Sequence, residues 1–262
     1  MGINKPYYRI YRPGSSDPFI SDSRNVDDMY TYIRSFRLLE DDLLKLFTNV
    51  EPTNDNLKVY SHRLYELLLR ASTEFETNAM QILTYNGYTK KGNENFNIKD
   101  YYKINEATKL SDYEVTCELW HPIKVFKPFQ EWGNGHSLSW YQAYNDVKHN
   151  RSSEFSKASL DNVMNAITGV LAILYAQFDY FVITGPLASG TWSGLTIIDG
   201  DYTEPISSKS IFHVVRPKWT EDEKYVFNWD EIKNSNDAFA KYPFKKEEVP
   251  VKRRPVNNEV NK

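Results

Sequence analysis

Apolar residues recur at helical spacing along four stretches of the chain, which places them on one face of each predicted helix. The expected helices cover about 26–50, 54–86, 139–150 and 159–184. The last stretch is apolar around most of its circumference, which is typical of a helix at the centre of a fold. Asn25 stands where a helix cap is expected, and Asn86-Gly87 and Gly185-Pro186 stand where helices should end.

Short β-prone runs flank the helical region. They lie at 7–11, 195–198, 211–215 and 225–229. An isolated short strand is not stable, so we expect the N-terminal strand at 7–11 to pair with a C-terminal strand. Prolines and a Gly-Asn-Gly turn argue against long regular elements over 113–136.

Together these patterns predict a mainly α protein, built as a helical bundle of about four main helices with short β-strands from the N- and C-terminal segments. We expect one mainly helical domain over 1–244, with a helical core at about 25–185 and β-prone segments at 7–11 and 195–230. Residues 245–262 combine Lys and Arg with Pro and Asn, which predicts a disordered basic tail.

Composition narrows the class of protein. The chain has 262 residues and a formal net charge of -3, so its overall charge does not indicate a protein that coats duplex DNA. The single cysteine, Cys117, cannot form an intrachain disulfide, and residues 1–12 contain no apolar signal-peptide core. Polar residues such as Gln177 and Asp179 interrupt the apolar stretch 163–183. We therefore expect no membrane partner and a cytoplasmic location.

The most informative segment for chemistry is 140–151. On a helix, Tyr141, Asn145, Lys148 and His149 share one face, with Arg151 just beyond the last turn. Histidine can exchange a proton near neutral pH, the cations can hold a phosphate, and an asparagine can orient a sugar hydroxyl or the imidazole. The set suits phosphodiester chemistry that requires no cofactor. The alternative is an ordinary helix end, where the macrodipole favours cations anyway.

A second set of charges lies on the predicted helix over 54–86. Its members alternate in sign at helical spacing and are Arg63, Glu66, Arg70 and Glu74. Leucines crowd this helix almost all round, so we expect the first three to line a polar cleft with Tyr141 and Tyr144. The alternative is a solvated stripe of ion pairs, each worth about 0.3–0.5 kcal/mol.

Metal binding is only weakly indicated. Cys117 and His121 are close in sequence, but Pro122 follows and no second pair completes four ligands. We therefore expect no metal site.

At Tyr144-Asn145-x-x-Lys148-His149-x-Arg151, between a long leucine-rich helix and an apolar one, the sequence resembles the HEPN superfamily (higher eukaryotes and prokaryotes nucleotide-binding domains). The segment 63–70 is similar to the helix that faces the catalytic helix in this family. The resemblance covers about 25–85 and 137–184. His149 matches the histidine of the family motif.

One position departs from that motif. The arginine that usually precedes the histidine is absent, because Tyr144, Ala143 and Gln142 stand there. Asn145 and Lys148 supply polar groups instead.

The resemblance implies a helical bundle that pairs as a homodimer and acts in bacterial phage defence or a toxin–antitoxin system. Many members are metal-independent endoribonucleases, and others bind nucleotide or RNA without cutting it. The implied partners are RNA or a nucleotide, and an antitoxin or another defence-system protein. In a cleaving member, His149 would move the proton, Lys148 and Arg151 would hold the phosphate, and Asn145 would orient. The alternative is a non-catalytic helical protein-interaction module, and a third reading is a small-molecule binding protein.

Overall fold

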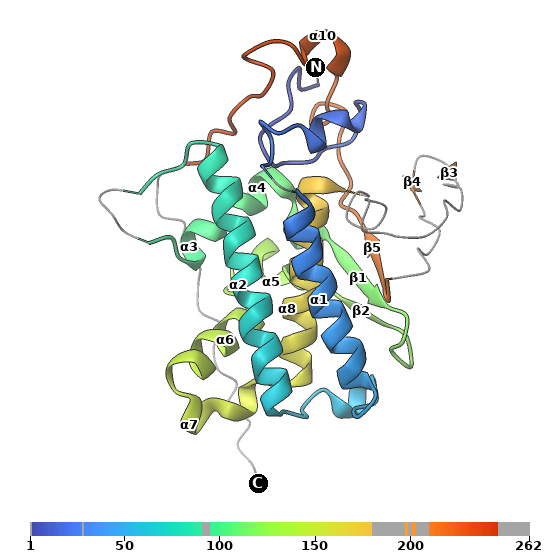
Figure 1. The fold of residues 1–262 in the computed structure, drawn as a ribbon, viewed down its shortest axis with the longest axis vertical. Helices are drawn as coiled ribbons and strands as arrows, with labels where there is room; N and C mark the ends of the chain where they lie inside the picture. The colour runs from blue at the N-terminus through green and yellow to red at the C-terminus, as the bar shows by residue number, and fades with distance from the viewer. Residues whose placement is uncertain are drawn as a thin grey trace.

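The computed structural model describes residues 2–27, 29–90, 95–179, 197–198, 201–202 and 210–245, and helices dominate it (Figure 1). The longer helices are α1 (Met29–Phe47), α2 (His62–Tyr85), α6 (Ser139–His149) and α8 (Leu160–Phe178). The shorter helices are α3 (Ile98–Tyr101), α4 (Ile104–Thr108), α5 (Gln130–Gly133), α7 (Arg151–Glu154) and α10 (Trp229–Ile232). Single 3-10 turns are η1 (Asp17–Ser21), η2 (Asn54–Asn56), η3 (Leu110–Asp112) and η4 (Phe155–Lys157).

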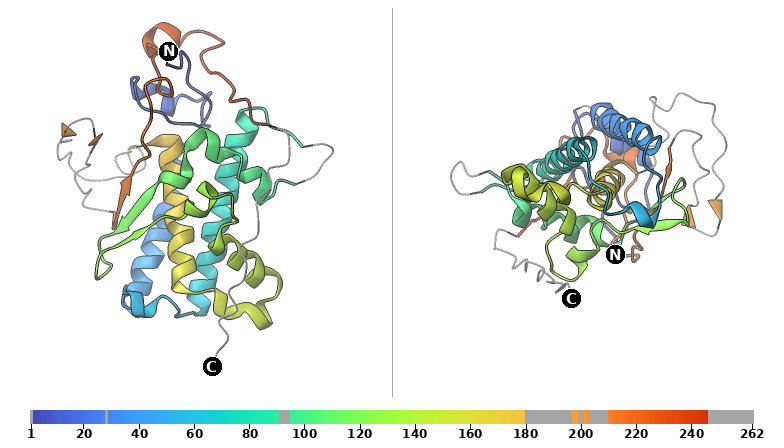
Figure 2. Two further views of the ribbon diagram at one scale, coloured as in Figure 1. Left: turned by 180° about the vertical axis from the view of Figure 1, so that it is seen from behind. Right: turned by 90° about the horizontal axis from the view of Figure 1, so that it is seen from below.

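Helix α8 lies at the centre, as its apolar circumference predicts. It contacts α1, α2, α6 and the strands β1 and β2, and Figure 2 shows it enclosed when the molecule is viewed from below. Nearly all of its side chains are buried, and each large one contributes about 1.5–3 kcal/mol to folding. The helix begins where expected, because the Ser159 side chain accepts a hydrogen bond from the Asn162 backbone N–H. The predicted stop at Gly185-Pro186 lies outside the described residues.

The predicted helix over 54–86 is shorter than expected. Residues 54–56 form the turn η2, and α2 begins only at His62, where the Ser61 side chain caps the Leu64 backbone N–H. The end at Asn86-Gly87 is confirmed, with Gly87 at a φ of 77° that suits glycine.

The expected cap of the first helix is wrong. Asn25 is buried, and its side chain accepts a hydrogen bond from the Arg9 backbone N–H and donates one to the Ile20 carbonyl. Asn25 therefore fixes the N-terminal segment rather than the start of α1.

Three short strands form an antiparallel sheet of order β2-β1-β5 beside α8. The strands are β1 (Glu114–Cys117), β2 (Lys124–Phe126) and β5 (Phe212–Val215). Val115 pairs with Phe126 on one side and Val214 on the other, and all three are buried. The predicted run at 211–215 is thus confirmed as a strand. Its partner is β1, a strand of four residues in the region where we expected no long regular element.

The predicted strand at 7–11 is wrong. Arg9 has a φ of 55°, a left-handed conformation that interrupts an extended backbone. Single parallel bridges join Ile3 to Tyr225 and Tyr7 to Ala240, so the N-terminal segment does lie along the C-terminal one without forming a sheet. The predicted strand at 225–229 is likewise one bridge at Tyr225 followed by α10.

Two predicted segments are covered only in part. Of 195–198, the structure describes Ile197–Ile198 as strand β3, which pairs with β4 (Asp201–Tyr202). Of the predicted tail 245–262, only Lys245 falls within the described residues.

A buried polar network joins the N-terminal segment to two helices. Arg9 is 1% exposed, and its Nε donates to Gln177 Oε1 at 2.8 Å. Gln177 Nε2 in turn donates to Asn78 Oδ1 at 2.9 Å. The Arg9 guanidinium also lies over the Tyr32 ring at 4.5 Å. The network therefore links α2, α8 and the N-terminal segment through one buried cation.

Within the described ranges, no helix combines the length and the apolar character that a bilayer crossing requires.

Candidate functional site at the end of α6

Helix α6 buries one face and presents its last turn to solvent. Trp140, Tyr144 and Val147 are buried against α2 and α8, whereas Lys148 and His149 at the C-terminal end are exposed. The Glu131 carboxylate holds the other end of the helix by accepting a hydrogen bond from the Ser139 backbone N–H at 2.6 Å. The packing of α6 thus fixes the direction in which its exposed cations point.

A chain of hydrogen bonds runs from α2 to Lys148. Tyr141 Oη donates to Glu76 Oε1 at 2.5 Å, and Tyr144 Oη lies 3.5 Å from Glu76 Oε2. Lys148 Nζ donates to Tyr144 Oη at 2.9 Å. Burial, reinforced by the bond to Glu76, raises the pKa of Tyr141 far above its ordinary value. The hydrogen bond to Tyr144 raises the pKa of Lys148, so its ammonium form is stabilised.

Glu76 belongs to the candidate site but was not singled out from the sequence. It lies on the face of α2 that carries His62 and Tyr65, the two α2 residues that contact Arg151. Spacings of 3 and 11 residues place all three on one side of a helix. This spacing is the only sequence signal that could have pointed to Glu76. It can be used only when α6 is known to pack against this face of α2.

Arg151 lies against the start of α2. Its Nη2 lies 3.4 Å from His62 Nδ1, and its guanidinium lies 5.1 Å from the centre of the Tyr65 ring. The Phe155 ring is close as well, at 5.9 Å. Figure 1 shows α7, where Arg151 lies, beside the first turn of α2.

His149 is exposed, and its ring takes part in no hydrogen bond among the residues that the structure describes. The Asn145 side chain donates to the Tyr141 carbonyl at 3.2 Å, a bond within its own helix. Asn145 is therefore engaged with the backbone rather than with the imidazole.

The carboxylates around His149 are paired with another cation. Lys157 Nζ lies 2.6 Å from both Asp146 and Glu154. Over the described part of the chain, neither Lys148 nor Arg151 forms an ion pair with a carboxylate. Lys148 and Arg151, the cations next to His149 in sequence, are thus bound to no carboxylate and contact a tyrosine hydroxyl and aromatic rings instead.

The charged stripe of α2 does not join this site. Arg63 pairs with Glu66 at 2.8 Å, and Arg70 pairs with Asp42 of α1 at 2.5 Å, with all three stripe residues exposed. The stripe is one position out of phase with His62 and Tyr65, so it points along α1 and into solvent. The solvated alternative is the correct one for these three residues, which line no cleft with Tyr141 and Tyr144.

Cys117 and His121, the two residues that gave a weak indication of metal binding, lie in different environments. Cys117 is buried in β1, and burial raises the pKa of its thiol to about 11, whereas His121 is exposed beyond the strand. A protonated, buried thiol is a poor ligand.

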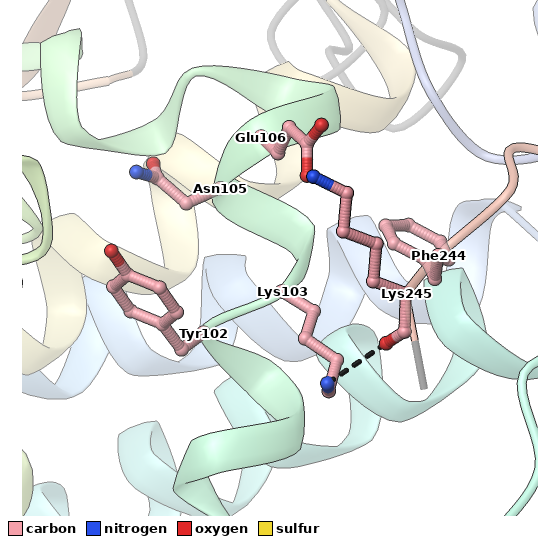
Figure 3. A pocket seen from close by; sticks show the side chains of 6 residues that line it. All are labelled: Tyr102, Lys103, Asn105, Glu106, Phe244 and Lys245. Carbon is pink, nitrogen blue, oxygen red and sulfur yellow. Dashed lines mark hydrogen bonds between the residues drawn. The ribbon is translucent and has the colours of Figure 1, made fainter. Parts of the chain in front are cut away.

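A pocket of about 270 Å³ lies elsewhere, between α4 and the C-terminal segment. Its lining residues are Tyr102, Lys103, Asn105, Glu106, Phe244 and Lys245 (Figure 3). Lys103 Nζ donates to the Lys245 carbonyl at 2.8 Å, and the side chains of Glu106 and Lys245 point toward one another. The charges of this pocket therefore face groups of the chain itself, which favours the end of α6 as the candidate site.

No protein family model matches the chain, and no curated protein or solved structure is significantly similar to it.

Proposed function

We propose that the exposed end of α6 binds RNA or a nucleotide through phosphate, and that His149 moves a proton in a metal-independent cleavage. One observation carries the proposal: the exposed His149 follows Lys148 and closely precedes Arg151 in sequence, and neither cation forms an ion pair with a described carboxylate. Phosphate binding by such cations is electrostatic and independent of base sequence.

The chemistry follows the HEPN resemblance. The ribose 2′-oxygen attacks the adjacent phosphorus, its bond to phosphorus forms, and the bond from phosphorus to the 5′-oxygen breaks. His149 accepts the proton of the 2′-hydroxyl, and the imidazolium so formed donates a proton to the leaving 5′-oxygen, which gives a 2′,3′-cyclic phosphate and a 5′-hydroxyl. Lys148 and Arg151 offset the negative charge that gathers on the phosphate oxygens.

The proposal extends to the rest of the family's architecture. The packing of α8 against α1, α2 and α6 supports a HEPN-like four-helix bundle. A C2 homodimer would bring two copies of the α6 end together and double the cations around one phosphate. A role in bacterial defence in the cytoplasm, with an antitoxin or similar protein as partner, belongs to the same proposal.

Our first prediction is that His149→Ala loses RNA cleavage. Removing a proton-transfer group typically costs about 10²–10⁴ in rate, and an exposed residue at a helix end contributes little to stability. The measurement compares purified wild type and variant on total RNA with EDTA present, which silences contaminating metal nucleases. Lys148→Ala should show a smaller loss.

The matched control is His121→Ala, which removes another exposed histidine in the hairpin between β1 and β2. It should cleave like the wild type. Equal cleavage by His149→Ala and wild type would refute the role of His149, and a wild type that cuts nothing would refute the enzyme.

A non-catalytic protein-interaction module is the second candidate, and a surface feature favours it. Large apolar side chains are exposed on β2, β5 and the β1–β2 connection, and they are Leu119, Ile123, Val125 and Val215. Ile123 is 72% exposed. Exposed apolar side chains mark interaction sites in many proteins when they form a contiguous patch.

A further inference from the structure

A cluster of rings and one cation lies next to the α6 end on the molecular surface. We call it the aromatic platform, and its members are Tyr60, His62, Tyr65, Arg151 and Phe155. Phe155 is the central ring, with ring centres 4.8 Å from His62, 5.7 Å from Tyr60 and 6.1 Å from Tyr65. Tyr60 is 51% exposed and His62 is exposed, so the platform offers ring surface to solvent.

The backbone beneath the platform is held in place. An antiparallel bridge joins Tyr60 to Ser159, and the Leu160 N–H donates to the Val59 carbonyl at 2.8 Å. The Asp161 N–H donates to the Leu57 carbonyl at 3.0 Å. The segment before α2 is thereby fastened to the first turn of α8, the most deeply buried helix. A ligand would meet rings that are already positioned, and positioned rings lose little entropy on binding.

Arg151 connects the platform to the phosphate site. Its guanidinium stacks on Tyr65 and contacts His62, and it lies two residues beyond His149 in sequence. Exposed rings combined with cations are the means by which proteins bind single-stranded nucleic acid, because every base has a face that can stack. In a duplex those faces are covered by neighbouring bases.

We infer that the aromatic platform stacks on an unpaired base adjacent to the phosphate held at His149, so the ligand of this site is single-stranded RNA. The inference rests on the proposed function and adds the structural class of the substrate. It assigns Tyr60 and Phe155 to binding rather than to catalysis.

The test measures binding without cleavage. The probes are fluorescent 2′-O-methyl oligonucleotides of about eight nucleotides, which lack the attacking hydroxyl, in three forms: single-stranded, abasic over the same length, and duplex. Wild type should bind the single strand more tightly than the abasic strand or the duplex. Tyr60→Leu and Phe155→Leu should weaken binding of the single strand by roughly 5- to 150-fold, the range for loss of one stacked base.

Two controls separate stacking from general effects. Tyr60→Phe retains the ring and should bind like the wild type. Tyr30→Leu removes an exposed tyrosine from the first turn of α1, which Figure 1 places at the opposite end of the helices, and it should also leave binding unchanged. Tyr60 is half exposed, so its replacement tests the platform even where Phe155→Leu disturbs the fold.

The outcomes distinguish this inference from the function on which it rests. Equal affinity for the single-stranded and abasic probes, or unchanged affinity in Tyr60→Leu, overturns the platform while His149-dependent cleavage still stands. A wild type that binds no probe and cuts no RNA overturns both. Binding of a protein in place of RNA at this surface, lost in Tyr60→Leu, would also refute the assignment.

Discussion

Side chains on two helices stabilise the ammonium form of Lys148. Tyr144 accepts its hydrogen bond and Glu76 of α2 stands behind that tyrosine, so a charge on the surface of α6 depends on a carboxylate of α2. The hydrogen bond also fixes the direction of the Lys148 side chain, and therefore the place at which its charge can meet a phosphate.

We predict that Tyr144→Phe lowers the pKa of Lys148 toward its ordinary value. The variant keeps the buried ring and removes the hydroxyl that stabilises the ammonium, and its stability should fall by about 0.5–1.5 kcal/mol. NMR titration of the lysine side chains measures the pKa. Tyr141→Phe is the control. It should leave the pKa of Lys148 unchanged, because Lys148 forms its hydrogen bond with Tyr144 and not with Tyr141. An unchanged pKa of Lys148 in Tyr144→Phe would show that the hydrogen bond does not set it.

At the scale of the elements, Gln177 of α8 joins the N-terminal segment to α2, because its side chain bonds both Arg9 and Asn78. This side chain is the acceptor for the Nε of a buried arginine, whose pKa is lowered mainly by burial. Burying a cation is costly unless its hydrogen bonds are made.

We therefore predict that Gln177→Leu destabilises the protein by about 3 kcal/mol, because Arg9 then lacks its acceptor. Chemical denaturation measures the free energy of unfolding. The double variant Arg9→Met/Gln177→Leu removes both partners and should be less destabilised than Gln177→Leu. If the double variant is the less stable of the two, the cost arises from lost packing and not from the unpaired cation.

A second junction, between α4 and the C-terminal segment, depends on pH. Lys109 follows α4, and its Nζ lies 2.6 Å from the Glu223 carboxylate, which also accepts from the Thr220 N–H at 2.9 Å. The hydrogen bond to Lys109 is the main reason that the pKa of Glu223 falls from 4.5 to about 2. A carboxyl with a lowered pKa stabilises the fold above its ordinary pKa, and that contribution is lost as the pH falls toward 2.

Glu223→Gln should accordingly reduce stability at neutral pH, by about 1 kcal/mol because the pair is only partly buried and solvent weakens its attraction. Near pH 2 the variant and the wild type should be equally stable. Urea unfolding at the two pH values gives the comparison. If the variant and the wild type differ in stability by the same amount at both pH values, the ionised carboxylate of Glu223 is not the source of the difference.

The sequence predicted the elements that local spacing determines. The apolar repeats placed the end of α2, both ends of α6 and the start of α8 to within one residue. The start of α2 and the end of α8 were extended too far, since α2 begins only at His62 and α8 ends at Phe178, before the predicted end at 184. Strand β1 was not predicted, because its pairing joins Glu114 to Val215, and no local pattern reports a partner so far along the chain. The run at 7–11 has strand-like residues, yet the left-handed Arg9 follows from a tertiary bond to Asn25.

The candidate site shows the same division. His149 and Lys148 were placed correctly at an exposed helix end from spacing alone. The charged stripe Arg63, Glu66 and Arg70 was wrongly expected to face α6. The α2 residues that contact Arg151 are each one position earlier in sequence, at His62 and Tyr65. Spacing shows which residues share a face of a helix, but not which neighbouring element packs on that face. Glu76 was not predicted for the same reason.

For the whole molecule, the proposal predicts a homodimer in which the α6–α7 ends lie near the two-fold axis. Light scattering at micromolar concentration should give twice the mass of the chain. Ser152→Cys places an exposed thiol on α7 and should form an inter-subunit disulfide under mild oxidation, whereas Ser23→Cys, at an exposed position in the N-terminal segment, should not. A monomer, or equal cross-linking of both variants, would contradict this arrangement.

The contacts between the two ends of the chain also constrain its biosynthesis. Tyr225 Oη accepts from the Tyr7 backbone N–H and donates to the Ile10 carbonyl, yet Tyr7 and Tyr225 are 218 positions apart. At about 5–20 residues per second, translation needs roughly 10–40 s to cover that distance. The segment around Tyr7 is therefore synthesised well before the tyrosine that holds it. Arg9 can bond Asn25 and Gln177 before Tyr225 is made, but the Tyr7 N–H and the Ile10 carbonyl cannot form their two bonds to this tyrosine until then. Nascent chains that stop before Tyr225 should therefore leave this segment incompletely held and more open to proteases.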